Sequence, residues 1–423
     1  MPRGLGTILL LCSGLLAGDA PTFYRDALPV LQTHCQQCHR PGEIAPMAFL
    51  TYSQTRPWAK AIREAVVLKK MPPWFAQPGY RPFANDPSLS QPEIDTLVKW
   101  ADNGAPEGSP KDVPTPRNWP DGWNIPAPDA VLEMPRAFPL PASGDVDYQY
   151  IVIPTGFTED KWIRMAELRP SDRAVVHHAV VYIRESGSPW LHDAKPGVPY
   201  VPTGGTPRER LLNGATTSDI LLVYSPGRLA ENWGPAMGKL IKAGSDLVFQ
   251  MHYTPKGHAT SDQARLGLVF ARTVPRQRVL TLQLSDDRFV IPPGHPHYRV
   301  VAWGTMPNNT VLLSFFPHMH LRGASFEYNI VEPDGRRRTL LRVKPYDFYW
   351  QLSYRLAQPL AIEAGTKLEC VAYFDNSRNN PNNPDPEEAV RFGPQSREEM
   401  MIGFFDVAVD PRMDKTEFFV RQR

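Results

Sequence analysis

Two cysteines and a histidine near the N-terminus form the most specific chemical motif in the sequence. Cys35 and Cys38 are separated by two residues, and His39 directly follows the second cysteine. This spacing is typical of covalent haem attachment, with the adjacent imidazole bound to the iron. Zinc binding or dithiol redox chemistry is the alternative, but zinc needs two further ligands and the chain has no second cysteine pair. We therefore expect a haem c.

The haem iron needs a second axial ligand on its opposite face. We predict Met71, because a thioether suits haem iron and the prolines of the following Pro72–Trp74 segment would stiffen its loop. Met47 is the alternative ligand, although it follows His39 so closely that little chain remains to reach the other face of the haem. An ordinary core position is the other interpretation of Met71, since methionine often fills gaps in cores.

Histidines beyond about residue 125 stand in segments of strand-like sequence. His318 and His320 are two residues apart, so on a strand both would face the same side and could reach one ion, while Met319 between them would point into the core. His177 and His178 are adjacent and would face opposite sides of a regular strand. Either that strand is bulged, or only one of the two binds a metal. Any one histidine is more often structural than a ligand, but this grouping favours a metal site.

The N-terminus resembles a secretory signal over residues 1–20. Arg3 is followed by a short apolar run and by small residues at Gly18–Ala20, whereas about 20 apolar residues are needed to cross a bilayer. A lipoprotein anchor at Cys12 is a weaker alternative, because a leucine precedes it. We expect an exported protein, periplasmic or secreted, without a membrane span, which agrees with haem attachment outside the cytoplasm.

The overall composition narrows the classes of partner. The chain has 423 residues, with 46 Lys and Arg against 44 Asp and Glu, so no strong field would attract nucleic acid or an anionic membrane. Of the 4 cysteines, one lies in the signal and two belong to the haem motif. Cys370 is left alone, so we expect no disulfide, and stability must come from core burial.

The remaining pattern predicts a multidomain protein with one helical and two β domains. Residues 21–108 should form a small all-α cytochrome c domain that ends in a helix, with a capping box from Ser90 to Glu93. Residues 109–124, rich in proline and tryptophan, should be an extended linker. Residues 125–280 and 281–423 should form two all-β sandwiches. Short β-type segments indicate this, namely 148–153, 174–183, 245–253, 298–303, 310–316 and 326–331, whereas a helical turn is possible only near 207–213.

At these residues the chain resembles the copper type II, ascorbate-dependent monooxygenases, such as the peptidylglycine α-hydroxylating and dopamine β-monooxygenases. The resemblance rests on four motifs in the family's order: Val176–Ala179, Leu247–Tyr253, Pro317–His320 and Glu398–Met401. The haem motif, the MPPW segment and the stretches 374–377 and 383–386 resemble a bacterial group in which a cytochrome c is fused to this module. The resemblance implies jelly-roll-like sandwiches and two copper ions.

The resemblance also implies roles for individual residues. Three histidines match an electron-transfer copper site in the first sandwich, and three residues match a separate oxygen-activating copper site in the second. The methionine of the second site is Met400 rather than Met401, because the acidic pair of the family's motif directly precedes Met400. Gln250 matches a family glutamine, whereas His295 and His297 match no ligand and are expected to be structural or at the surface. The first set is His177, His178 and His252, and the second, catalytic set is His318, His320 and Met400.

Two positions depart from the family members that act on peptidylglycine. Where these have an arginine and a tyrosine that hold the substrate carboxylate, this chain has Phe316 and Phe404. A neutral or aromatic C–H substrate is therefore expected. The predicted function is that of an exported monooxygenase (an oxidoreductase) that uses O2 to hydroxylate a small-molecule substrate. An ascorbate-like reductant or a redox protein would supply the electrons, which the haem would relay. The alternatives are a haem and copper electron-transfer protein without oxygenase activity, and a binding module with structural histidines.

Overall fold

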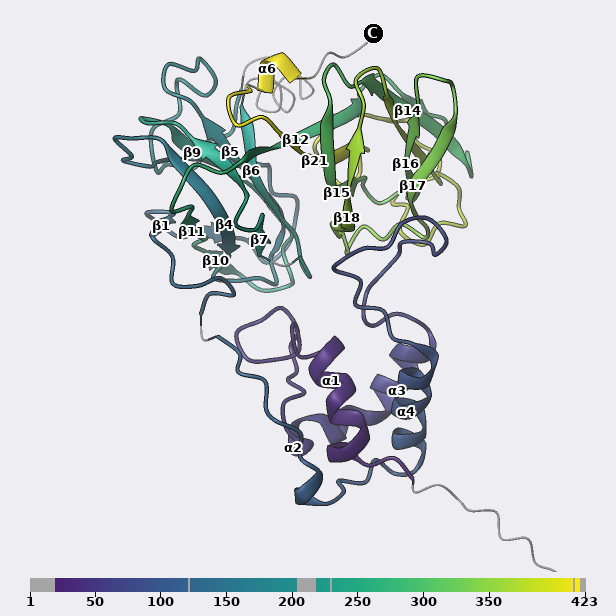
Figure 1. The fold of residues 1–423 in the computed structure, drawn as a ribbon. Coiled ribbons are helices and arrows are strands. Elements are labelled where there is room, and N and C mark those ends of the chain that lie inside the picture. The colour runs from purple at the N-terminus through teal and green to yellow at the C-terminus, as the bar shows by residue number, and fades with distance from the viewer. Residues whose placement is uncertain (1–19, 121, 204–217, 229, 414, 419–423) are drawn as a thin grey trace, which may run out of the picture. The chain divides into compact units, whose positions relative to one another are not determined.

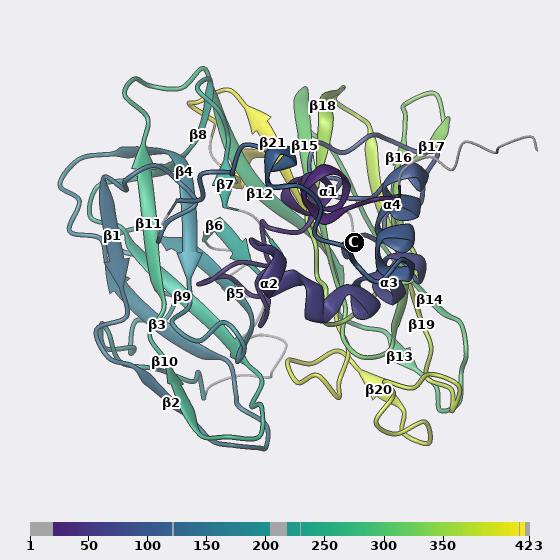
Figure 2. The same cartoon turned by 90° about the horizontal axis from the view of Figure 1, so that it is seen from below.

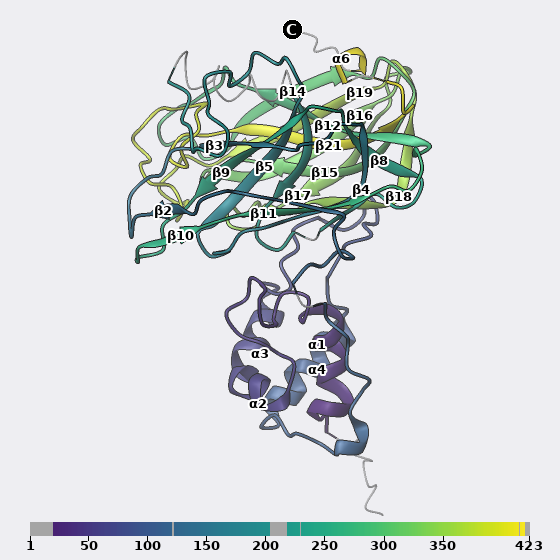
Figure 3. The same ribbon diagram turned by 90° about the vertical axis from the view of Figure 1, so that its left-hand side faces the viewer.

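The N-terminal part of the chain forms a small helical unit (Figure 3). The computed structural model describes residues 20–120, 122–203, 218–228, 230–413 and 415–418. Phe23, Leu31, Leu97 and Trp100 are fully buried at the centre of the helical unit. Its helical segments are η1 (Phe23–Ala27), α1 (Leu28–His34), α2 (Tyr52–Thr55), η2 (Arg56–Trp58), α3 (Ala59–Val67), α4 (Gln91–Asp102) and η3 (Pro110–Asp112).

Helix α4 forms for the local reasons that its sequence indicates. Ser90 and Glu93 make the predicted capping box, in which the Glu93 carboxylate accepts a hydrogen bond of 2.7 Å from the Ser90 backbone N–H. The helix ends at Asp102, and Asn103 is its C-cap. The capping box satisfies backbone donors that the first helical turn leaves free, so the predicted helix is confirmed.

The β part begins with a sandwich of two four-stranded layers, drawn in blue and teal in Figure 1. Branched and aromatic side chains from both layers meet between them, among them Leu168, Val181, Phe249 and Leu266. One layer contains β1 (Ala130–Glu133), β11 (Arg265–Phe270), β4 (Lys161–Arg169) and β8 (Met237–Ile241), and the other contains β3 (Gln149–Pro154), β9 (Asp246–Tyr253), β5 (Val176–Arg184) and β6 (Asp219–Tyr224).

A second four-on-four sandwich follows, drawn in green and yellow (Figure 2). Its core holds Phe315, Phe326, Tyr328 and Phe405, each at most 1% exposed. One layer contains β12 (Gln277–Asp286), β21 (Met401–Val409), β15 (Thr310–His318) and β18 (Tyr354–Ile362), and the other contains β14 (Tyr298–Thr305), β19 (Lys367–Phe374), β16 (Gly323–Val331) and β17 (Arg337–Val343).

A short parallel contact joins the two sandwiches into one β unit. Gln277 and Arg278 of β12 pair with Met237 and Gly238 of β8, so a layer of each sandwich belongs to one nine-stranded sheet. β12 crosses the predicted boundary between residues 280 and 281. The remaining small elements are β2 (Phe138–Leu140), β7 (Glu231–Asn232), β10 (Thr260–Asp262), β13 (Val290–Ile291), β20 (Val390–Arg391) and α6 (Lys415–Phe418).

The compact units divide the chain differently from the predicted limits of 21–108. Residues 42–44 and 73–87 belong to the β unit, and residues 109–117 belong to the helical unit. Residues 73–87 belong to the β unit because Trp74 and Phe83 lie against Tyr354, with ring centroids 4.8 Å and 5.7 Å from that of Tyr354. For the first stretch, Glu43 forms an ion pair of 2.9 Å with Arg173.

The structure confirms a mainly β protein with several antiparallel sheets and a few N-terminal helices. Each of the six predicted β segments overlaps a strand. The predicted signal of residues 1–20, apart from residue 20 itself, and the possible turn in 207–213 lie outside the described residues. Among the described residues, no helix has the length and apolar character needed to cross a membrane.

Candidate metal centre

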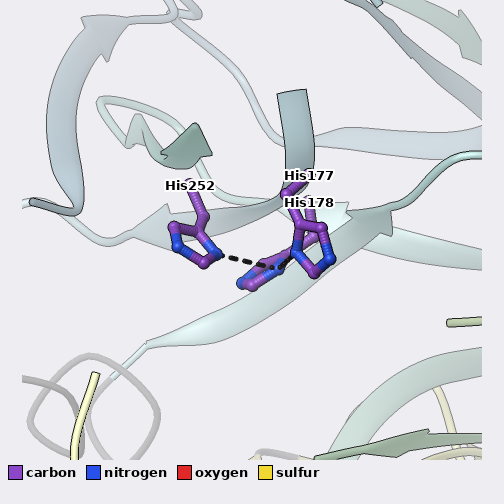
Figure 4. Close-up of side chains that lie close together, drawn as sticks. All are labelled: His177, His178 and His252. Atoms are coloured by element: carbon purple, nitrogen blue, oxygen red, sulfur yellow. Dashed lines mark hydrogen bonds between the residues drawn. The ribbon is translucent and has the colours of Figure 1, made fainter. Parts of the chain in front are cut away.

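Three predicted ligands come together on two neighbouring strands of the first sandwich. His178 of β5 lies opposite His252 of β9, and the register of this pair shifts between Val176 and His178. His177 is therefore the extra residue of a β-bulge, which lets consecutive side chains turn toward one site. Of the two possibilities left open by the sequence, the bulge is confirmed. Figure 4 shows the three imidazoles converging.

The nitrogens that face one another are all Nδ1 atoms. The Nδ1 of His178 lies 3.1 Å from that of His177 and 3.4 Å from that of His252. His177 Nε2 lies 3.2 Å from the backbone oxygen of Phe348, which can only accept, so this nitrogen carries the hydrogen and Nδ1 holds a lone pair. His178 Nε2 lies 3.0 Å from the Tyr148 hydroxyl. These residues can hold a metal ion through three converging nitrogens.

A metal-free arrangement of the same atoms also satisfies the hydrogen bonds. Tyr148 would then donate to His178 Nε2, and a hydrogen on His178 Nδ1 would be shared between the other two Nδ1 atoms. A metal ion would instead take all three lone pairs and leave the outer nitrogens of His177 and His178 free to donate to Phe348 and Tyr148.

Burial keeps these imidazoles neutral, which is the form that binds metals. It lowers the pKa of His177 to about 3, and the neighbouring His318 adds to this effect. Burial also holds the pKa values of His178 and His252 well below the usual histidine range, with smaller contributions from the other imidazoles. Protons therefore do not compete for these nitrogens near neutral pH.

The second predicted histidine pair lies at the end of β15. This strand ends at His318, and His320 lies just beyond it. His318 Nδ1 donates to the Gln351 side-chain oxygen at 2.7 Å. His320 Nδ1 donates to the backbone oxygen of Glu398 at 3.2 Å, while His320 Nε2 is buried without a hydrogen-bond partner. An unpaired lone pair in a buried position is costly, and a metal ion would satisfy it.

Met400 immediately precedes β21, and only 2% of its surface is exposed. A buried carboxylate holds this residue close to the histidine pair. Glu399 accepts backbone hydrogen bonds from His320 at 2.8 Å and Met400 at 3.2 Å through one oxygen, and from Arg322 at 2.6 Å through the other. Burial raises the pKa of Glu399 to about 8. The sequence marked Glu399 only by its place before Met400 and gave no sign of this bridging role.

The two predicted ligand sets, expected to be separate, are in contact. The rings of His178 and His318 are in contact, with centroids 5.0 Å apart, and those of His318 and His320 are 5.2 Å apart. The reason lies in the packing of one sandwich against the other. Apolar side chains of the β3-β9-β5-β6 layer and of the β15 and β21 strands form one buried cluster, which includes Val180, Val223, Phe316 and Phe404.

A small, mainly apolar cavity of about 40 Å³ adjoins these residues. His178, His318 and Met400 all line it, so both predicted ligand sets reach the same space. Phe316 and Phe404, which replace the charged and phenolic residues of the resembled family, belong to its wall, with ring centroids 5.8 Å apart. The other lining residues are Tyr148, Val180, Tyr182, Val223, Gln250, Gln283, Phe392 and Ile402.

The other residues singled out in the sequence have contacts of their own. Gln250 donates at 2.7 Å to the Tyr150 hydroxyl. Met319 is fully buried in the core of the second sandwich, as expected. His295 is half-buried and His297 is exposed, and His295 Nδ1 accepts from the backbone N–H of His297. They are structural or surface residues, as predicted.

The residues of the haem motif lie in the helical unit. Burial, reinforced by Cys38, raises the pKa of the Cys35 thiol to about 12. A protonated thiol is a poor redox nucleophile, which disfavours the dithiol alternative. The His39 ring stacks on Phe49 with centroids 4.3 Å apart, and burial lowers its pKa, so its nitrogens are suited to bind iron. Met47 and Met71 are both half-buried, and Met47 packs against the helical core. The choice of axial ligand stays a prediction.

No family model matches the sequence, and no curated protein matches it. Among solved structures, the chain is similar to that of infectious bursal disease virus, Gt strain, at 10% identity over 68% of this chain and 72% of the other, with a TM-score of 0.20. It is also similar to allantoicase, at 9% identity over 56% of this chain and 81% of the other, with a TM-score of 0.15. At these TM-scores the likeness supports no argument about the site.

Proposed function

We propose that this protein is an exported, copper-dependent monooxygenase that hydroxylates a C–H bond of a small, neutral substrate and carries a covalent haem c. One observation supports the proposal most: neutral imidazoles and a thioether, the donor set that suits copper, border a single apolar cavity. The two sandwiches would then be jelly-roll-like, as in the monooxygenases that the sequence resembles.

Each ligand set would hold one copper ion. His177, His178 and His252 offer three imidazole nitrogens, a set that binds copper in either oxidation state. His318, His320 and Met400 offer two imidazoles and a soft thioether, which favours Cu(I). When bound, the copper ions would supply a position for dioxygen and two of the electrons that reduce it.

The chain itself binds and orients the substrate. Phe316 and Phe404 give the cavity an apolar wall, and apolar surface excludes water from the reacting bond. Arg228 lies over the Phe316 ring at 5.1 Å, but its guanidinium is paired with Glu231 at 2.5 Å. The lining thus favours a neutral or aromatic compound over a carboxylate.

The reaction needs electrons from outside the protein. One O2, two electrons and two protons convert the substrate into its hydroxylated product and one water. A haem held by Cys35, Cys38 and His39, with Met71 as axial ligand, would accept electrons from an ascorbate-like reductant or a redox protein and pass them to copper. This relay is consistent with an exported, periplasmic or secreted protein.

An electron-transfer protein without oxygenase activity is the second candidate. The direct contact between the His178 and His318 rings favours it, because adjacent metals exchange electrons whether or not oxygen reacts. A binding module with structural histidines is the third, and the metal-free hydrogen-bond arrangement of the histidines is compatible with it.

Metal analysis and oxygen uptake separate the three candidates. About two copper and one iron per chain fit the enzyme and the electron carrier, whereas iron alone fits the binding module. The copper-loaded, haem-replete protein should then consume O2 with a neutral aromatic or aliphatic compound and form a hydroxylated product. Met400→Leu should bind haem normally and lose this coupled uptake. Rapid oxidation of the reduced protein without any product from a broad substrate panel would support the electron carrier instead.

A further inference from the structure

We infer that the two predicted ligand sets form one coupled two-metal centre, supported by the segment Phe348–Gln351, rather than two independent sites. The inference rests on the metal binding in the proposed function but not on its oxygenase reaction. Neither the sequence nor its resemblance to a family indicated this arrangement.

Direct contact between the sets is the first observation. The His178 ring meets the His318 ring at 5.0 Å and an interplanar angle of 73°, so no side chain separates them. His178 belongs to the three-histidine set, and His318 to the set with His320 and Met400. Ions bound by these touching imidazoles would be close enough for their unpaired electrons to interact and for the charge of one to affect binding of the other.

A hydrogen-bond chain from one set to the other is the second observation. The backbone oxygen of Phe348 lies 3.2 Å from His177 Nε2 and 3.2 Å from the side-chain nitrogen of Gln351, and both nitrogens donate to it. The side-chain oxygen of Gln351 accepts from His318 Nδ1 at 2.7 Å. A carbonyl oxygen has two lone pairs, so it can accept both hydrogens.

The hydrogen bonds from His177 through Phe348 and Gln351 to His318 fix which nitrogen of each ring is available to a metal. They keep a hydrogen on His177 Nε2 and on His318 Nδ1, which leaves the lone pairs on His177 Nδ1 and His318 Nε2. The Phe348 ring also stacks on His177, with centroids 4.2 Å apart. Gln351 is 2% exposed, so water does not replace its bonds. Gln351 is thus a positioning residue for both sets.

Electron paramagnetic resonance of the copper-loaded protein tests the coupling without using activity. At one Cu(II) per chain we expect the full signal of an isolated ion. At two Cu(II) per chain we expect a broadened signal that integrates to clearly fewer than two spins. A two-copper spectrum equal to the sum of two isolated Cu(II) signals would overturn the inference. His320→Ala, which should hold only one copper, provides the reference spectrum.

Substitutions of Gln351 test the shared support. Gln351→Leu removes both side-chain bonds and should weaken copper binding at both sets by about 10- to 100-fold, the usual effect of losing such a partner. Gln351→Glu still accepts from His318 but cannot donate to Phe348, so it should retain most of the affinity at the second set. Gln283→Leu is the matched control, because Gln283 lines the same cavity and lies on β12.

The outcomes distinguish the inference from the proposed function. An unaltered three-histidine affinity in Gln351→Leu would refute the shared support, and if that variant does not fold, the same comparison is made with Gln351→Glu. Coupled spins without oxygen-dependent product formation would refute the monooxygenase and leave the two-metal centre in place. Product formation by a protein whose copper ions are magnetically independent would refute the coupled two-metal centre and leave the monooxygenase in place.

Discussion

Tyr148 provides a sensitive test of the three-histidine site. Its hydroxyl lies 3.0 Å from His178 Nε2, and its ring stacks on His252 with centroids 4.6 Å apart and planes 16° from parallel. Tyr148→Phe removes only the hydroxyl and keeps the stacked ring. With copper on His178 Nδ1, the hydrogen on Nε2 would then be buried without an acceptor.

The size of the effect follows from that lost partner. A buried donor left unsatisfied costs about 1–3 kcal/mol, and each 1.4 kcal/mol is about tenfold in affinity. We therefore expect copper affinity at this site to fall by about 10- to 100-fold, in agreement with the usual effect of removing a residue that orients a ligand. The melting temperatures of the metal-free and the copper-loaded protein should both fall, and that of the copper-loaded protein should fall further, because the Nε2 hydrogen of a metal-bound imidazole is the stronger donor.

Competition titration with a copper chelator measures the affinity, and calorimetry measures the melting temperatures. Tyr182→Phe is the matched control, because Tyr182 lines the same cavity but packs edge-on against Trp190. Equal copper affinities for Tyr148→Phe, Tyr182→Phe and the unmodified protein would refute the reasoning, since they would mean that the Tyr148 hydroxyl does not orient a metal-binding His178.

Three further predictions concern stability and the haem. The metal-free protein should lose stability as the pH falls below about 6.5, because burial lowers the pKa of His177 to about 3 and of His318 to about 4 while the histidines of the unfolded chain take up protons. The free energy of unfolding should fall by about 1.4 kcal/mol per pH unit for each such imidazole. Unfolding free energies from urea titrations that stay constant from pH 7 to 5 would contradict this prediction. Glu399→Gln should lower the free energy of unfolding by about 1–3 kcal/mol, because one of the three backbone N–H groups that Glu399 accepts would face an amide NH2. Urea unfolding measures this loss, and an unchanged unfolding midpoint would count against the prediction. Met71→Ala, but not Met47→Ala, should abolish the methionine-to-iron absorption band and lower the haem potential, and the opposite pattern would assign Met47 as the ligand.

Local sequence patterns predicted the elements of the fold and the positions of the histidines. Ser90 and Glu93 defined the start of α4, and alternation placed His252 on a strand. Alternation alone could not decide how His177 and His178 share a face, because a bulge depends on the pairing of β5 with β9. The same limit applies to β15, which has an irregularity between Leu312 and Ser314.

The partners that orient the histidines could not be predicted from local patterns. Gln351 meets His318 across 33 positions of sequence, and Tyr148 meets His178 across 30. Such contacts depend on how the layers stack, which periodicity does not encode. For the same reason, the sequence assigned two ligand sets to two sandwiches but gave no information on the contact between them.

The division of the chain between its compact units has a practical consequence for taking the protein apart. Because residues 42–44 and 73–87 belong to the β unit, the polypeptide passes from one unit to the other several times before residue 118. A protease cut within 109–124 would therefore leave the fragments held together by non-covalent burial of Trp74 and Phe83. Expressing residues 20–117 alone would expose those two rings to water, so a well-behaved helical fragment calls for replacement of 73–87 by a short polar loop.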